Sequence, residues 1–343
     1  MTPPPRLPDF SSIGRFLRRL TTVTSKEPKI TLGVDIGSTC VKVVALGTRK
    51  GPGTRPILGS NLVPIPAAQG TDPSRAIKTA VSGLHLPLQT AALSVSGSWV
   101  IMRVIEMPNM ALSEIRQALP FEAQRYLPFN LQEVVIDGVV LGPAEGNKVW
   151  VLIIACRKEL IERRLDWAKR AGLEVSLIDV DAVALTNGFL ATFNGRPEGI
   201  TALVNVGSQF TNLSMCQGQI PYLVRDIPWG AEKCFRHAAE HLGIEPEILL
   251  RTSSDEPAPA GLADAMKTVC EGLVTELQLS FDYFENRFGR SPAEVLVTGG
   301  LSQSADFMIA LKSHLTQPVT PWIPAKELSG QFAIAYGLAL RMD

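Results

Sequence analysis

Two short segments of the sequence place a turn-forming glycine and hydroxyl side chains directly after an apolar run. One is VDIGSTCVKVVAL, which starts at Val34, and the other is VNVGSQFTNLSMC, which starts at Val204. Glycine allows a tight turn and a close approach of the backbone to a ligand. Consecutive N–H groups of a turn, together with hydroxyl groups, can surround phosphate oxygens. Each segment therefore predicts a phosphate-binding turn, although a plain β-hairpin with a Gly-Ser turn would have the same pattern.

The first segment also carries two charged side chains. Asp35 would supply a carboxylate for Mg²⁺, usually through water, and Lys42 would supply a point charge for a phosphate. The second segment repeats the first at a distance of 170 residues (204 minus 34), so that the matching pairs are Asp35 and Asn205, Gly37 and Gly207, and Ser38 and Ser208. A repeat at half the chain length indicates two related domains facing each other. With a glycine-ended strand at Gly299 and Gly300 to lie against a purine base, these features predict a nucleotide cleft.

The surrounding sequence predicts the elements that position these turns. Hydrophobic patterning predicts strands at 30–36 and 41–46 and helices at 158–172 and 261–289. A helix near residue 74 would be capped by Thr71 or Asp72, and a helix near residue 113 by Ser113. Pro120 should kink or split this latter helix. Strands and helices alternate along the whole chain, which gives an α/β or α+β fold class.

Composition sets the class of protein. A chain of 343 residues suggests two domains, at about 100–200 residues each. The formal net charge is zero, so no whole-protein electrostatic argument supports a nucleic-acid partner. No apolar run approaches the ~20 residues of a transmembrane helix, and no signal-peptide stretch is evident. Five cysteines without a C-x-x-C pair indicate free thiols in a reducing compartment. We therefore expect a cytoplasmic protein.

Residues 1–28 differ from the rest of the chain, because they open with a proline-rich stretch. Within residues 7–20, one face of a short helix would carry Phe10, Ile13, Leu17 and Leu20, with arginines on the other faces. Such a helix would dock on an anionic membrane surface or on a partner. The alternative is a flexible tail whose apolar residues pack locally.

The order of the motifs VDIGST, IDVDAVAL, LVNVGSQFTNLS, RDIPWG, VLVTGGLS and FAIAYGLALR resembles the actin/Hsp70/hexokinase superfamily. The chain is more closely similar to the PilM family, the actin-like proteins of type IV pilus assembly. PFEAQRYLPF is the most family-specific stretch, and the resemblance extends from about residue 30 to residue 343. It implies an α/β, actin-like ATPase fold with two RNase H-like lobes around a nucleotide cleft.

The resemblance also implies a division of the chain. Residues 1–28 would be the tail, residues 96–156 an inserted small α/β subdomain, and residues 199–325 the second lobe, with a helical part at about 231–290. The first lobe would combine three segments, namely 29–95, 157–198 and 326–343.

The resemblance implies ATP and Mg²⁺ as ligands. The first phosphate loop would comprise Asp35, Gly37, Ser38, Thr39 and Lys42, with Asp35 holding Mg²⁺ through water. The second loop would comprise Asn205, Gly207, Ser208 and Gln209. Asp181 would orient the metal-bound or attacking water, and Gly230 would lead into the helix that contacts the base. The adenosine motif would comprise Gly299, Gly300 and Ser302.

Three positions depart from the family pattern. The second loop carries Asn205 where an aspartate is usual, so it has one carboxylate fewer for Mg²⁺. Ala231 and Leu301 each add a side chain where a glycine is common. We therefore expect weakened ATP binding and slow or absent hydrolysis.

The family implies a cytoplasmic adaptor, peripheral to the inner membrane, that binds the N-terminal cytoplasmic peptide of a PilN-like inner-membrane protein. A groove in residues 95–155 would hold the peptide. Its apolar candidates are Trp99, Phe121, Tyr126 and Phe129, although core positions are the more common place for such residues. A homo-oligomer and contacts with the wider inner-membrane platform are compatible with this function.

Several alternatives remain open on sequence grounds. The protein would otherwise be an active ATPase or small-molecule kinase, an FtsA-like membrane-tethered filament protein, or a platform protein of general secretion. An H-x-x-E-H pattern at His237, Glu240 and His241 would place two histidines on one helix face, as in some zinc peptidases. This pattern is short and lies between the actin-like motifs, so we expect a structural helix without zinc.

Overall fold

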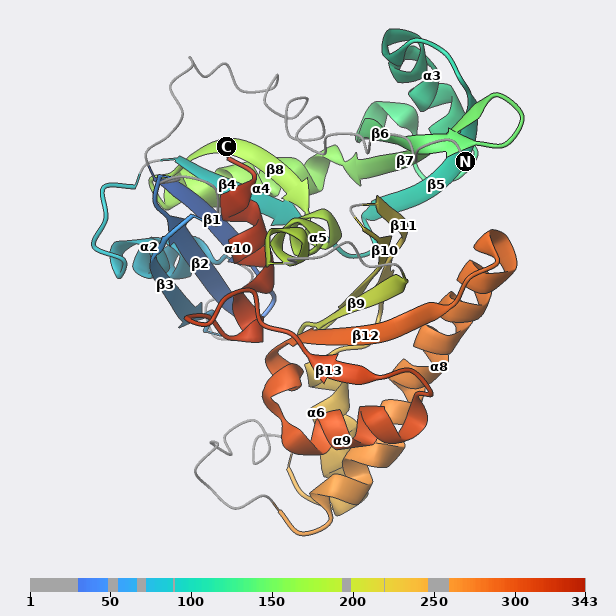
Figure 1. Cartoon of the computed structure of the whole chain (residues 1–343). Coiled ribbons are helices and arrows are strands. Elements are labelled where there is room, and N and C mark those ends of the chain that lie inside the picture. Colours follow the sequence, from blue (N-terminus) through green and yellow to red (C-terminus); the bar gives the residue numbers. More distant parts are fainter. Residues whose placement is uncertain are drawn as a thin grey trace.

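The computed structural model describes residues 30–48, 55–66, 72–88, 90–192, 199–218, 220–245 and 259–342. Two five-stranded sheets and one three-stranded sheet form its framework (Figure 1). The tail at 1–28, with its predicted helix, lies outside the described residues.

The first lobe is built on the sheet β3-β2-β1-β4-β8. Its strands are β1 (Thr31–Ile36), β2 (Cys40–Leu46), β3 (Ile57–Pro64), β4 (Thr90–Val95) and β8 (Glu174–Val180). Helices α2 (Ser74–Ser82), α4 (Lys158–Arg170), α5 (Asp181–Thr192) and α10 (Ala333–Leu340) accompany it. Every residue of β1 is buried, because this central strand is covered on both faces.

The second lobe is built on the sheet β11-β10-β9-β12-β13, which repeats the strand order of the first. Its strands are β9 (Ile200–Val206), β10 (Thr211–Gln217), β11 (Ile220–Ile227), β12 (Pro292–Gly299) and β13 (Val319–Pro321). Its helices are α6 (Ala231–Leu242), α8 (Leu262–Phe288) and α9 (Ala305–His314). The registers also match, since Asp35 faces Lys42 and Asn205 faces Asn212. The predicted repeat is therefore a repeat of whole sheets.

The third sheet, β5-β7-β6, forms an inserted subdomain with helix α3. Its elements are β5 (Val100–Pro108), α3 (Leu112–Gln124), β6 (Val134–Ala144) and β7 (Lys148–Arg157). Leu119 and Val151 belong to its own apolar core. The chain enters it after β4 and returns directly into α4, and β5 lies beside β11 of the second lobe (Figure 1).

Both predicted helix caps are wrong. Ser113 does not cap α3. Ala111 precedes the helix instead, and the Glu114 carboxylate accepts the Ala111 N–H at 2.8 Å. At α2 the cap position belongs to Pro73, which makes no side-chain hydrogen bond, although Asp72, one residue earlier, accepts the Ser74 N–H at 3.0 Å. Pro120 does not split α3, which continues to Gln124.

Helix α10 packs unusually close to two neighbours. A Cβ atom added to Gly33 of β1 would lie 2.0 Å from the Ala335 carbonyl oxygen, and one added to Gly337 would lie 1.8 Å from the Ala184 carbonyl oxygen of α5. A buried ion pair at 2.8 Å between Asp179 of β8 and Arg341 closes the end of this helix. Close backbone contact, in addition to side-chain packing, thus fixes α10 against β1 and α5.

We predict that Gly337→Ala destabilises the protein. Alanine in place of a helical glycine ordinarily stabilises by about 0.5–1 kcal/mol, but here overpacking should reverse the sign and cost about 1–3 kcal/mol or more. Gly272→Ala in α8 is the matched control, because its added Cβ would meet Trp229 at an ordinary 3.5 Å. Chemical denaturation of both variants checks this, and equal effects of the two substitutions would contradict it.

Candidate functional site

The turns after β1 and β9 open into one cavity of about 540 Å³ between the lobes. All of the residues predicted for the two phosphate loops line it, and so does Asp181. From the first lobe these are Asp35, Gly37, Ser38, Thr39, Lys42 and Asp181, and from the second Asn205, Gly207, Ser208 and Gln209. Segments 170 residues apart in the sequence therefore meet at one site.

The two turns have the same construction. The Gly37 N–H donates to the Cys40 carbonyl oxygen at 3.1 Å, and the Gly207 N–H donates to the Phe210 carbonyl oxygen at 3.0 Å. A Cβ atom on Gly207 would lie 2.8 Å from that oxygen, so the turn requires glycine. Because these two amides are used within the turns, the N–H groups at the turn tips are the ones placed to bind an anion.

Gly230 lies directly before α6, in agreement with the family pattern, whereas a contact of this helix with a base stays a prediction. A Cβ atom there would lie 2.4 Å from the Ser208 carbonyl oxygen. The next two N–H groups, those of Ala231 and Glu232, donate to the carbonyl oxygens of Gly207 and Ser208, each at 2.9 Å. The start of α6 therefore supports the second turn, and Gly230 is not among the residues that line the cavity.

The residues of the predicted adenosine motif lie behind the second turn, outside this cavity lining. Gly299 has φ of +90°, and its added Cβ would lie 2.3 Å from the Val206 carbonyl oxygen. The Ser302 hydroxyl donates to the Gly299 carbonyl oxygen at 2.8 Å, whereas a Cβ atom on Gly300 would meet nothing within 4 Å. Gly299 and Ser302 thus shape the end of β12, and Gly300 borders open space.

Asp35 and Lys42 form an ion pair of 2.8 Å whose side chains are only 8% and 16% exposed. Burial acts to lower the pKa of Lys42, but the charge and hydrogen bond of Asp35, together with the effects of Cys40 and Asp181, raise that pKa above its ordinary value. Lys42 is therefore firmly charged. A phosphate entering the cavity would meet a cation that is already held in place.

Asp181, the first residue of α5, also faces this cavity. Burial and the nearby Asp35 carboxylate raise its pKa to about 7, against hydrogen bonds from Ser94 and Ser96 that lower it. A cation would favour the ionised form of Asp181. Two carboxylates beside turn amides and a lysine therefore fit a phosphate ligand with a divalent cation.

Asn205 begins a chain of hydrogen bonds that sequence reasoning missed. Its Nδ2 donates to Asn212 Oδ1 at 2.8 Å, and Asn212 Nδ2 donates to Asp226 Oδ1 at 2.7 Å. The Asp226 Oδ2 accepts the Gly97 N–H at 2.6 Å, at the entrance to the inserted subdomain. An ionised aspartate at position 205 would have no N–H to donate, so this chain requires the amide. The one available signal was that Asn212 occupies the repeat position of Lys42.

Sequence reasoning also missed Arg163, Arg164 and Trp167, which α4 contributes to the cavity lining. Trp99 lines it as well, and the guanidinium groups of Arg157 and Arg163 lie 4.7 and 5.1 Å from its ring centroid. Charged residues on an amphipathic helix usually face solvent, so only the tertiary structure places these arginines at the site.

The four aromatic groove candidates divide into two pairs. Trp99 and Phe129 are half-buried, and both contact the Arg157 guanidinium. Phe121 and Tyr126 are 73% and 43% exposed, so the expectation that they lie in the core is wrong.

The H-x-x-E-H residues lie on α6, where His237 Nδ1 is 3.5 Å from Glu240. Within the part of the chain that the structure describes, no group of three or more His, Cys, Asp or Glu side chains is gathered around a metal position. All five cysteines are free thiols. No helix among the described residues has the length and apolar character to cross a membrane.

The family model described as type IV pilus assembly protein PilM matches residues 33–342. The chain belongs to this family. A solved structure described as a PilM-PilN type IV pilus biogenesis complex is 25% identical, covering 92% of this chain and 99% of that chain with a TM-score of 0.80. The resemblance inferred from the motifs is therefore confirmed, together with the actin-like ATPase fold.

Two more distant structures share the fold. The ethanolamine utilization protein EutJ from Carboxydothermus hydrogenoformans is 14% identical, with a TM-score of 0.57 and coverage of 96% of each chain. A diol dehydratase-reactivating factor in nucleotide-free form is 9% identical, with a TM-score of 0.56 and coverage of 91% of this chain and 99% of its own. Similarity at this level concerns the fold alone.

Asp181→Asn should change the pH dependence of stability. Because the Asp181 pKa is raised from 3.8 to about 7 on folding, the wild type loses stability as pH rises between those values. The asparagine variant should avoid this loss, so the stability difference between variant and wild type should shift in favour of the variant by about 2 kcal/mol between pH 5 and pH 8. Denaturation across this pH range, with exposed Glu271→Gln as the control, checks the prediction. A pH-independent difference would contradict it.

Asn205→Asp should destabilise the protein at pH 8 by about 1–3 kcal/mol. The variant would place carboxylates at both ends of the Asn212 side chain, which has a single NH₂ group to share between them. Acidification should restore stability, because the introduced carboxyl group, once protonated, donates a hydrogen bond again. Thermal unfolding at pH 8 and pH 4.5 measures both effects, and a variant as stable as wild type at pH 8 would refute the donor role of Asn205.

Proposed function

We propose that this protein is a nucleotide-binding adaptor of type IV pilus assembly that binds the cytoplasmic N-terminal peptide of a PilN-like inner-membrane protein. The observation that carries this proposal is its similarity to the PilM of the PilM-PilN complex across nearly the whole of both chains. A cytoplasmic position at the inner membrane follows from such a partner.

The nucleotide part of the proposal rests on the cavity between the lobes. Residues of the two turns, with Lys42, would bind the phosphates of ATP, and Asp35 and Asp181 would hold the waters of a Mg²⁺ ion. When bound, Mg²⁺ would supply charge neutralisation to the phosphates. Asn205 carries no charge and is engaged with Asn212, so it has no capacity to act as a base. Slow or absent hydrolysis is therefore part of the proposal.

Two connections link this cavity to the inserted subdomain. One is the chain from Asn205 to the Gly97 N–H. The other is covalent, because β7 ends at Arg157 and α4 begins at Lys158 without a loop. A ligand that changes the separation of the lobes would act on both connections. We infer that ATP is a conformational ligand, which alters peptide affinity if it binds one arrangement more tightly.

The peptide would bind to the inserted subdomain, within residues 95–155. Phe121 of α3 and Tyr126 just beyond it are large apolar side chains that the fold leaves exposed. Burying one aromatic side chain on binding contributes about 1.5–3 kcal/mol. These two residues are the first positions at which a contact should be tested.

The test is a titration of the N-terminal cytoplasmic peptide of the cognate PilN-like protein, with and without Mg-ATP. We expect Phe121→Ser to weaken binding about tenfold or more, whereas Ile309→Ser in α9 should leave it unchanged. Ile309 is a suitable control because it is 64% exposed and lies on the second lobe.

Two results would contradict parts of the proposal. Absence of peptide binding by the wild type would overturn the adaptor function. Equal peptide affinity with and without Mg-ATP, under conditions in which ATP binds, would overturn the conformational role of the nucleotide. Phosphate release that is lost in Asp35→Ala would instead establish an ATPase.

A further inference from the structure

The phosphate-binding turns are not the only source of positive charge in the cavity. Helix α4 brings Arg163 and Arg164 to its lining, next to Trp167. The guanidinium carbon of Arg164 lies 5.1 Å from the Trp167 ring centroid, which holds the group against an aromatic face. No motif of either turn includes these residues, and they enter the site only through the fold.

Two arginines line the cavity, and Arg164 is the one of them without an ion pair to a described residue, since Arg163 pairs with Glu159. Its Nε atom is buried and has no hydrogen-bond partner within the described residues. Buried polar atoms are usually paired, so such an atom needs an explanation. Burial lowers the pKa of Arg164, while the charges of Asp181 and Asp35 oppose that effect.

The nearby carboxylates do not account for this arginine. Asp35 already forms its ion pair with Lys42 at 2.8 Å. Asp181 accepts hydrogen bonds from Ser94 and Ser96. Among the described residues, no ion pair joins Arg164 to either acid. A half-buried guanidinium with donors to spare, facing a cavity, therefore points to an anionic ligand.

The position of Arg164 indicates which end of a bound nucleotide this side chain would contact. Gly299, Gly300 and Ser302, which would contact the adenosine, belong to the second lobe and lie outside the cavity lining that contains α4. The cavity joins both phosphate turns to Arg164, so α4 stands at the phosphate end. The group furthest from the base is the terminal phosphate.

We propose that Arg164 binds the terminal phosphate of the nucleotide and thereby distinguishes a triphosphate from a diphosphate. This inference rests on the nucleotide part of the proposed function. A guanidinium group makes two parallel hydrogen bonds to phosphate oxygens, and Arg164 would use its unpaired donors in this way. With Asn205 in place of an acid, the site would rely more on protein cations for neutralising the phosphates. Because α4 continues directly from β7, the inserted subdomain would be tied to the occupied phosphate position.

The test compares Mg-ATP and Mg-ADP by titration calorimetry in the wild type and in Arg164→Gln and Arg164→Lys. We expect Arg164→Gln to weaken Mg-ATP binding about tenfold or more, as for one lost charge-assisted pair, and to change Mg-ADP binding less than about threefold. Arg164→Lys keeps the positive charge but loses the two parallel N–H donors of the guanidinium group. Its affinity for Mg-ATP should therefore lie between those of the wild type and Arg164→Gln. Quenching of tryptophan fluorescence by ATP gives a second readout, which should be smaller in Trp167→Phe because Trp99 also lines the cavity.

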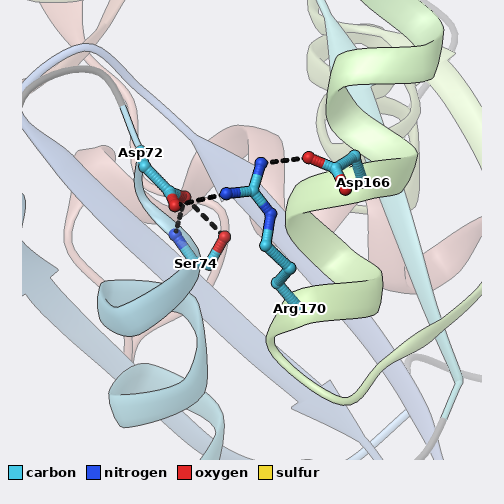
Figure 2. Close-up of polar contacts among 4 residues, drawn as sticks. All are labelled: Asp72, Ser74, Asp166 and Arg170. Carbon is cyan, nitrogen blue, oxygen red and sulfur yellow. Dashed lines mark hydrogen bonds and ion pairs between the residues drawn. The ribbon is translucent and has the colours of Figure 1, made fainter.

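Arg170→Gln is the matched control on the same helix. Figure 2 shows that the Arg170 side chain reaches Asp166 on its own helix and Asp72 just before α2, and Arg170 is not among the residues that line the cavity. It is half-exposed, and its loss should leave the affinity for both nucleotides unchanged. Thermal unfolding of each variant verifies that the fold is kept.

The possible results distinguish a failure of the proposed role of Arg164 from a failure of nucleotide binding itself. If the wild type binds Mg-ATP but Arg164→Gln binds ATP and ADP as the wild type does, the role of Arg164 is overturned and the nucleotide cleft stands. Equal losses for ATP and ADP would overturn recognition of the terminal phosphate. A wild type that binds neither Mg-ATP nor inorganic tripolyphosphate would overturn both proposals.

Discussion

The close packing of α10 against β1 and α5 is the constraint on which the site depends. The backbone of α10 touches both elements at Gly33 and Gly337, where no side chain fits. β1 contains Asp35 and α5 begins with Asp181, so this contact places both carboxylates of the first lobe at the cavity. Burial and the Asp35 carboxylate together raise the pKa of Asp181, and both depend on this packing arrangement several residues away.

The second turn has the same backbone construction as the first because the two sheets repeat. One pair of side chains departs from the repeat and changes the polar contacts at the second turn. Asp35 and Lys42 face each other as an ion pair, whereas Asn205 and Asn212, in the same register, face each other as an amide pair. The ion pair balances its own charge, whereas the amide pair is uncharged and has N–H groups left over, which Asn212 donates to Asp226. In place of a charge, the second turn thus has a polar connection from the cavity to the entrance of the inserted subdomain.

The sequence predicted what depends on local pattern. Both turns, the repeat and the helix that ends near Gly172 are visible because glycine and hydrophobic spacing fix them over a few residues. Arg164 and Asp226 were missed because their roles depend on partners far away in the chain. Ser113 was expected to cap α3, but the Glu114 side chain satisfies the N–H at that helix start instead. Phe121 was expected in the core because aromatic residues usually lie there, although a small subdomain has too little interior to bury each one.

Hydrogen–deuterium exchange with and without Mg-ATP tests most directly whether the cavity binds nucleotide and is linked to the inserted subdomain. Our account predicts slower exchange in the turns at 37–39 and 207–209, and also at Gly97 and the start of β5, which are not among the residues that line the cavity. Protection of the turns alone would show a nucleotide cleft that is not linked to the inserted subdomain. Unchanged exchange in both turns at saturating Mg-ATP would contradict the central claim, namely that the two turns bind the nucleotide.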